Sequence, residues 1–322
     1  MNRKYDRRGF LRVSAQGAAA AGLASVAGGM SLPGMDLVQA SLEDNPAVWI
    51  DSVVRDFFRE SPLNSLRNAA NEKAWADPLV GFSRGDDSLF SLYKDRVGPF
   101  HWTPLEIFQL TFPEVSAKPD ELTVITWILP QTEATKADHR RETMYPSERW
   151  ARSRLFGEEF NDGLRRHVAE RLVKSGLPAV APALSPQFRA QKSERYVLAS
   201  NWSERHAAYA SGLGTFGLCD GLITAKGKAM RCGSVVAKIK VPATPRPYED
   251  HHAYCLFYAK GTCGQCISRC PGKAITKSGH DKVACQKYVN VTANYVNSTF
   301  GLKTYGCGFC QVGVPCESQI PV

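Results

Sequence analysis

The cysteines of this chain are concentrated near its C-terminal end. None of the ten occurs before Cys219, and eight of them lie between Cys255 and Cys316. A chain of 322 residues, 43% of them hydrophobic, can bury a core without disulfide bonds to stabilise it. The eight clustered cysteines therefore need another role, and we interpret the C-terminal quarter of the chain as a distinct functional unit.

The spacing of these cysteines is typical of iron–sulfur ligands. Cys263, Cys266 and Cys270 form C-x₂-C-x₃-C-P, with Pro271 as the proline. Ferredoxins with two [4Fe–4S] clusters use C-x₂-C-x₂-C-x₃-C-P, in which the fourth cysteine ligates the other cluster. The short loop wraps one cluster, and the x₃ step carries the next thiolate towards its neighbour. The sequence therefore predicts two [4Fe–4S] clusters.

The motif departs from the ferredoxin pattern at two places. Lys260 stands where the first cysteine is expected, so Cys255 is the predicted replacement. The second group closes with C-x₂-C-x₅-C, and Pro315 precedes its last cysteine. Cross-ligation then assigns the eight cysteines to two sets of four. The first set is Cys255, Cys263, Cys266 and Cys316, and the second set is Cys270, Cys285, Cys307 and Cys310.

Three other uses of these cysteines stay open. A zinc ribbon built on the two C-x₂-C pairs would leave four thiols without a role. Disulfides form in exported proteins, although C-x₂-C-x₃-C-P is not typical disulfide spacing. A single cluster accompanied by structural cysteines is the third alternative. Cys219 and Cys232 lie outside both sets, and we expect them to be buried thiols.

The first forty residues are predicted to be a twin-arginine export signal. Arg7-Arg8-Gly9-Phe10-Leu11 is followed by an Ala- and Gly-rich apolar stretch from Val13 to Met30, which is too short and Gly-rich for a membrane span. Val38-Gln39-Ala40 fits a cleavage site. A basic tail or an uncleaved anchor is the alternative. Because the twin-arginine translocase carries folded proteins, we expect clusters inserted before export, and a protein in the periplasm or at the outer face of the cytoplasmic membrane.

The region between the signal and the cysteines has the patterns of helices and strands. Residues 46–58 and 158–175 have the apolar spacing of helices. Residues 122–129 and 178–184 are apolar runs that predict buried strands. The order strand, helix, strand favours an α/β layer. Prolines near residue 245 mark the expected end of this domain.

Polar residues before a Gly-rich turn are candidate catalytic groups. A Tyr or His there could donate a proton to a reduced substrate, and Arg205 could hold an anionic group. The alternative is that charged side chains on a helix are solvated or paired. In the turn, Gly212 and Gly214 predict a close approach of backbone. The catalytic candidates are Tyr196, Asn201, Arg205 and His206.

Several segments resemble the superfamily of epoxyqueuosine reductases and corrinoid-dependent reductive dehalogenases. Ser203–Gly217 is similar to the family segment E-R-x-x-A-x-x-A-G-L-G-x-x-G. Cys263–Ile275, Cys285–Tyr288 and Gly306–Val312 are similar to its double-cluster region. The resemblance implies a nitroreductase-like domain that holds a base-off corrinoid (cobalamin) near one cluster, with Gly212 and Gly214 against it. Leu198 stands where epoxyqueuosine reductases have their active-site Asp, and this argues against reduction of a tRNA base.

We therefore expect an α+β protein with three parts. Residues 1–40 are the signal, residues 41–245 the nitroreductase-like α/β domain, and residues 246–322 a ferredoxin-like domain with two [4Fe–4S] clusters. The favoured function is an exported oxidoreductase, similar to reductive dehalogenases, that passes electrons through the clusters to a corrinoid site and reduces a small organic substrate. The alternatives are an electron-transfer protein or subunit without a corrinoid, and a zinc scaffold.

The expected partners follow from this function. They are an electron donor protein or a membrane anchor subunit, a small-molecule substrate, and the twin-arginine translocase during export. The formal net charge is +9, and each tetrathiolate cluster adds about −2. The loaded protein is thus closer to neutrality, and no basic patch typical of nucleic-acid binding is evident.

Overall fold

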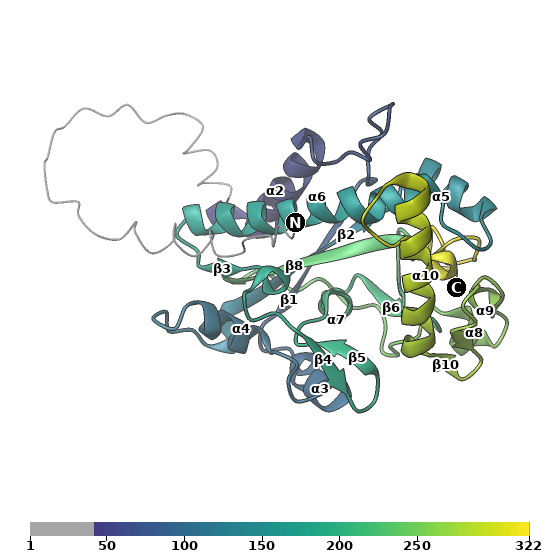
Figure 1. Cartoon of the computed structure of the whole chain (residues 1–322). Coiled ribbons are helices and arrows are strands. Elements are labelled where there is room, and N and C mark those ends of the chain that lie inside the picture. The colour runs from purple at the N-terminus through teal and green to yellow at the C-terminus, as the bar shows by residue number, and fades with distance from the viewer. Residues whose placement is uncertain (1–41, 322) are drawn as a thin grey trace, which may run out of the picture.

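A four-stranded antiparallel sheet forms the centre of the molecule (Figure 1). The computed structural model describes residues 42–321, so the predicted export signal lies outside the described residues. The strand order is β1-β2-β8-β3. β2 and β8 pair along their whole length, from Leu122 opposite Lys238 to Pro130 opposite Met230. The strands are β1 Leu79–Arg84, β2 Leu122–Pro130, β8 Met230–Lys238 and β3 Ala179–Val180.

The predicted strand at residues 122–129 is confirmed, and it is the most buried strand of the sheet. All nine residues of β2 are buried, because both faces of the sheet are covered. The strand at residues 178–184 is reduced to the two residues of β3 followed by a short 3₁₀ turn, Pro182–Leu184. β8 lies between β2 and β3 and is antiparallel to both. The strand that separates β2 from β3 in the sheet, β8, therefore comes from a later part of the chain.

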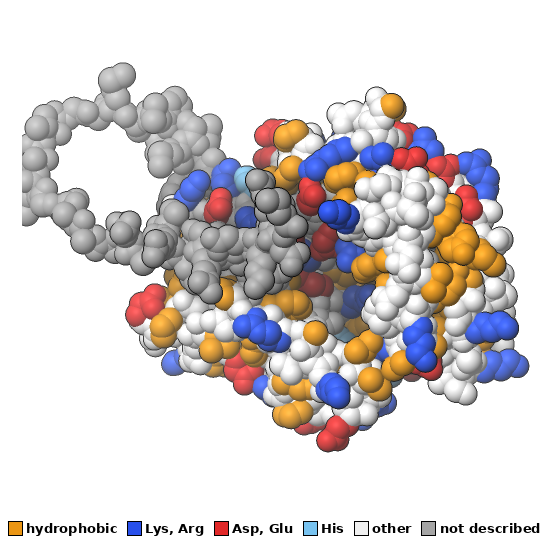
Figure 2. All heavy atoms as spheres, viewed as in Figure 1, with side chains coloured by type: hydrophobic (Ala, Val, Ile, Leu, Met, Phe, Trp, Pro, Cys, Tyr) orange, Lys and Arg blue, Asp and Glu red, His pale blue; other side chains and the backbone are white. Residues whose placement is uncertain are grey.

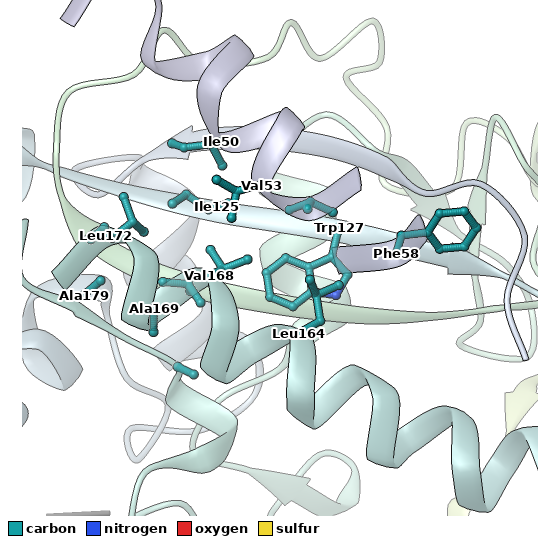
Figure 3. Close-up of a cluster of buried hydrophobic side chains, with 14 of the residues drawn as sticks. Ile50, Val53, Phe58, Ile125, Trp127, Leu164, Val168, Ala169, Leu172 and Ala179 are labelled. Atoms are coloured by element: carbon teal, nitrogen blue, oxygen red, sulfur yellow. The ribbon is translucent and has the colours of Figure 1, made fainter. Parts of the chain in front are cut away.

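Two helices cover one face of the sheet. α2, Pro46–Glu60, begins where Asn45 accepts a hydrogen bond from the Val48 amide and where Pro46 takes the first helical position. α6, Glu148–Lys174, is longer than the predicted helix and includes it. Figure 3 shows side chains of both helices pointing at β2, among them Ile50 and Val168. This apolar cluster holds α2 and α6 against the sheet.

The opposite face carries a second apolar core. It packs the shorter helices against Ile128 of β2 and Val236 of β8. A β-hairpin borders this face and contacts α10. The elements are α3 Ser88–Arg96, α4 Pro104–Thr111, α7 Glu204–Ala210, and the hairpin strands β4 Ala190–Ser193 and β5 Val197–Ser200. A 3₁₀ turn Pro119–Glu121 precedes β2, and α5 Glu133–Arg141 follows it.

The C-terminal region forms one end of the molecule, next to the small β6–β7 pair (Figure 1). It consists of short elements around one long helix. None of the helices between residues 42 and 321 is long and apolar enough to cross a membrane. The elements are β6 Gly214–Phe216, β7 Leu222–Thr224, α8 Leu256–Lys260, α9 Gln265–Ser268, β9 Ile275–Thr276, β10 Gly279–His280, α10 Lys282–Phe300 and a 3₁₀ turn Phe309–Gln311.

Phe160 tests the contribution of the α6 face to stability. Its side chain is 0% exposed and lies 5.3 Å, between ring centroids, from Phe57. We expect Phe160→Ala to lower the free energy of unfolding by about 3–5 kcal/mol, because it removes a large buried ring and leaves a cavity. Urea unfolding followed by circular dichroism measures the loss. Val173→Ala on the exposed side of α6 is the control, and a loss of the same size there would contradict this explanation.

Candidate functional site

Four cysteines of the C-terminal region line one small cavity. They are the predicted first set, Cys255, Cys263, Cys266 and Cys316, and the cavity measures about 20 Å³. Cys255 is the N-cap residue of α8, and Cys266 lies in α9. Leu218, Val314 and Pro315 supply apolar walls. The displaced position of Cys255 in the sequence thus still brings its side chain to the same cavity as the other three.

The second set is gathered beside the first. Burial raises the pKa of the Cys307 thiol to about 11, with the neighbouring Cys285 and Cys270 thiols adding to the shift. Cys310 lies close to Cys307 as well. Burial lowers the pKa of His280, but hydrogen bonds with Asp220 and the Cys285 thiol outweigh it and raise that pKa to about 9.

Two residues outside both sets lie between them. The Cys219 thiol lies near Cys266 of the first set and Cys310 of the second. The Lys228 Nζ lies 3.3 Å from the Cys219 Sγ. Lys228 is only 3% exposed, and it lines the cavity of the first set. Cys219 is a buried thiol, as predicted, but it occupies the junction of the two cysteine sets.

The chemistry of the thiol sets fits iron–sulfur clusters. All ten cysteines are free thiols. Within residues 42–321, no three His, Cys, Asp or Glu side chains come close enough together to hold a single metal ion. A [4Fe–4S] cluster takes four cysteine thiolates as ligands, and each set supplies four.

Neighbouring side chains fix the loops that carry the thiols. Trp150 of α6 donates a hydrogen bond from Nε1 to the Cys307 carbonyl at 2.6 Å. Gly308 has φ of +142°, and a Cβ there would lie 2.2 Å from the Trp150 ring. Arg269 donates to the carbonyls of Glu142, at 3.0 Å, and Val312, at 3.2 Å. The C-terminal loops are therefore attached to α6 and to the segment before it.

Two of the four candidate catalytic residues make contacts that hold parts of the fold together. The Asn201 amide is buried and bridges two loop positions, accepting from the Arg189 amide and donating to the Gln187 carbonyl, both at 2.9 Å. Tyr196 lies in the tip of the β4–β5 hairpin. Its ring centroid is 4.6 Å from the Lys282 ammonium, at the start of α10. The Tyr196 contact joins the hairpin to α10, and the catalytic role of both residues stays a prediction.

The other two candidates lie next to each other on α7. Arg205 is exposed and donates to the Asp220 carbonyl at 3.1 Å. His206 Nδ1 lies 2.7 Å from Ser203 Oγ, and its ring contacts Tyr93 at 4.6 Å between centroids. Burial lowers the pKa of His206 to about 3. The imidazole is thus neutral near pH 7, and it can donate a proton only from its neutral N–H.

The two predicted cofactor-binding glycines are enclosed by the chain itself. A Cβ on Gly212, where φ is +75°, would lie 2.4 Å from the Pro245 carbonyl oxygen. A Cβ on Gly214 would lie 2.2 Å from the Ile223 carbonyl oxygen. Backbone packing therefore explains the need for glycine at both positions. Their position against a corrinoid stays a prediction from the resemblance, and we assign no residue to hold that group.

Charged residues of α6 and β8 form a group that the sequence patterns did not indicate. The Arg154 guanidinium lies 4.5 Å from the Tyr305 ring centroid, and Arg231 Nε lies 3.8 Å from the Glu158 carboxylate. Burial would raise the pKa of Tyr305, but the charges of Arg231 and Arg154 lower it. Figure 2 shows Lys, Arg, Asp and Glu side chains gathered in a hollow of the surface beside α10.

Two histidines with lowered pKa values, the partly buried His206 and the buried His101, predict a loss of stability in acid. Burial lowers the pKa of His206 to about 3, and that of His101 to about 4. The unfolded chain takes up these protons near pH 6.5, so stability present above pH 6.5 is lost as the pH falls towards the folded-state values. Each histidine contributes about 1.4 kcal/mol per pH unit in this range.

His206→Gln should therefore flatten the pH dependence of the unfolding free energy. We expect the slope between pH 6 and pH 5 to fall by about 1.4 kcal/mol per unit relative to the unsubstituted chain. Above pH 7.5 the two slopes should agree, because neither state then exchanges this proton. Urea unfolding at fixed pH values measures both. Parallel curves over the whole range would show that His206 is not buried in its neutral form.

Comparisons with known proteins give matches only among solved structures. No protein-family model matches the chain, and neither does any curated protein. Epoxyqueuosine reductase from Bacillus subtilis is 17% identical, with a TM-score of 0.40, over 75% of this chain and 62% of that one. Catabolic reductive dehalogenase NpRdhA in complex with 3-bromo-4-hydroxybenzoic acid is 14% identical, with a TM-score of 0.47, over 86% of this chain and 37% of that one.

A further match is an epoxyqueuosine reductase bound to an epoxyqueuosine-modified tRNA-Tyr stem loop. It is 17% identical, with a TM-score of 0.41, over 76% of this chain and 62% of that one. This chain thus spans less than two thirds of the length of each structure. Both groups of enzymes named in the sequence resemblance are among the solved structures that are similar to this chain.

Proposed function

We propose that this chain is an exported oxidoreductase that holds two [4Fe–4S] clusters and reduces a small organic substrate. The observation that carries the proposal is the gathering of eight cysteines into two adjacent sets, one of which lines a small cavity. Each set offers the four thiolates that a [4Fe–4S] cluster needs. When bound, such clusters supply one-electron transfer at potentials that their surroundings adjust.

The chain's own residues would hold the clusters and exclude water from them. The thiols are the ligands, and an apolar cluster surrounds the first set with Leu218, Ile223, Ile275 and Val314. Burial of this kind limits solvent access and thereby affects the reduction potential. Trp150 and Arg269 keep the ligand loops in place through their carbonyl hydrogen bonds. The geometry therefore suits electron transfer within a larger folded domain.

The substrate side of the proposal rests on the residues near α7 and α10. Arg205 and Tyr196 remain the candidates to contact a substrate, with Arg231 and Tyr305 added from the structure. We propose a small organic molecule, with halogenated compounds as the first class to test. A corrinoid stays part of the proposal through the sequence resemblance only. An electron donor protein or membrane anchor subunit would supply electrons in the periplasm.

Metal analysis tests this proposal directly. The full chain is expressed anaerobically with cobalamin present, and iron, sulfide, cobalt and zinc are measured per chain. We expect about eight irons with matching sulfide. About one cobalt in addition supports the corrinoid reductase. Eight irons without cobalt, under conditions that load a known corrinoid enzyme, favour the electron-transfer protein instead. Zinc without sulfide overturns both.

A further inference from the structure

A lysine ammonium is buried among the cysteine thiols. Lys228 follows β7, and its backbone amide donates to the Cys316 carbonyl at 2.8 Å, which fixes it next to the first set. Its side chain is directed inward, because the residue is 3% exposed and lines the same cavity as the four thiols. The side-chain hydrogen bond of this ammonium is to the Cys219 Sγ at 3.3 Å.

The charge partners of this lysine are sulfur atoms. A buried ammonium costs free energy unless a negative group compensates it. Its side-chain hydrogen bond is to the Cys219 Sγ, and the cavity that it lines is also lined by the thiols of Cys255, Cys263, Cys266 and Cys316. These four thiols are the whole first set. A cation in this position is explained if the thiols carry negative charge, as they do when they ligate iron.

We propose that Lys228 is a positioning residue that acts as a fixed positive charge for the first cluster and raises its reduction potential. This inference rests on the proposed function, since it needs the clusters. Reduction adds an electron to a centre that is already negative, and a nearby buried cation favours the reduced state. N–H groups directed at cluster sulfurs act in the same direction. The Cys219 Sγ accepts a hydrogen bond from this ammonium. Because Cys219 lies near both sets, this bond keeps Lys228 at their junction.

Three variants of the full chain separate charge from packing. Lys228→Arg keeps the charge, Lys228→Met keeps approximate length without charge, and Lys226→Met removes an exposed lysine two positions away. Each is prepared anaerobically, its iron and sulfide are counted, and its midpoint potentials are measured by EPR-monitored titration. We expect the midpoint potential of one cluster to be lower in Lys228→Met by at least about 59 mV. For one electron, this shift is a tenfold change in the reduction equilibrium constant. Lys228→Arg should retain most of the potential, and Lys226→Met should match the unsubstituted chain.

Each outcome decides the question. If Lys228→Met holds its iron with unchanged potentials, the inference is overturned while the proposed function stands. If Lys228→Met loses the first cluster but Lys228→Arg retains it, the positive charge is needed for the cluster to be held, which supports the inference. Loss in both variants indicates packing and overturns it. If the unsubstituted chain itself holds no iron and sulfide, the proposed function fails, and the inference fails with it.

Discussion

The Cys255→Ser variant is expected to hold about half the iron of the unsubstituted chain, about four instead of about eight atoms, or to convert one cluster to a form with fewer irons. Cys255 is 8% exposed and lines the same cavity as Cys263, Cys266 and Cys316. A serine oxygen in this place is a poorer ligand for iron than a thiolate. Because the second set lies outside this cavity, the EPR signal of its cluster should persist.

The matched control for Cys255→Ser is Cys232→Ser. Cys232 is also buried, but it lies in β8, its Sγ is 3.5 Å from the Met230 Sδ, and it lines neither thiol set. Iron and sulfide content and the EPR spectrum of the reduced protein should be unchanged by this control substitution. Unchanged iron content and an unchanged spectrum in Cys255→Ser would refute the assignment of Cys255 as the displaced first ligand. A residue other than Cys255 would then replace the cysteine that is missing at Lys260.

The grouping of Cys263, Cys266 and Cys270 could be predicted from sequence because their spacing is local, and their role as cluster ligands stays a prediction. C-x₂-C loops and the step to Cys270 bring neighbouring thiols together whatever the rest of the fold does. Lys228 and Cys219 could not be predicted in the same way. Lys228 is held beside the thiols by the hydrogen bond from its backbone amide to the Cys316 carbonyl, a contact between distant parts of the chain. No periodicity or motif in the sequence encodes such a contact.

The sheet shows the same division between local and distant information. The apolar runs at β2 and at α2 are local patterns, and both elements form as predicted. The place of β8 between β2 and β3 depends on strand pairing across the chain, which the apolar pattern of one strand does not specify. Asn201 illustrates the limit for site residues, since its hydrogen bonds to the segment of Gln187 and Arg189 were not predicted and its catalytic role stays a prediction.

Arg165→Met is expected to lower the free energy of unfolding by about 2–3 kcal/mol, because it removes charge-assisted hydrogen bonds from three partly buried carboxylates. Arg165 in α6 is 4% exposed. Its guanidinium forms ion pairs with Asp162 at 2.7 Å and with Glu158 and Glu204 at 3.1 Å. Burial raises the pKa of Glu204, and the charge of Arg165 opposes that shift. Without the arginine, Glu204 must take up a proton or remain as an uncompensated charge.

The position of Arg165 makes this loss larger than that of a surface ion pair. Its guanidinium also donates to the Cys232 carbonyl at 3.1 Å, so it connects α6 with α7 and β8 beside the candidate catalytic residues. Arg59→Met removes an exposed partner of Asp56 on α2 and should cost less than about 1 kcal/mol. Arg165→Lys keeps the charge but not the planar fork, and an intermediate loss is expected. Urea unfolding of variants with equal iron content measures all three, and a loss in Arg165→Met no larger than that in Arg59→Met would show that these carboxylates are stable without it.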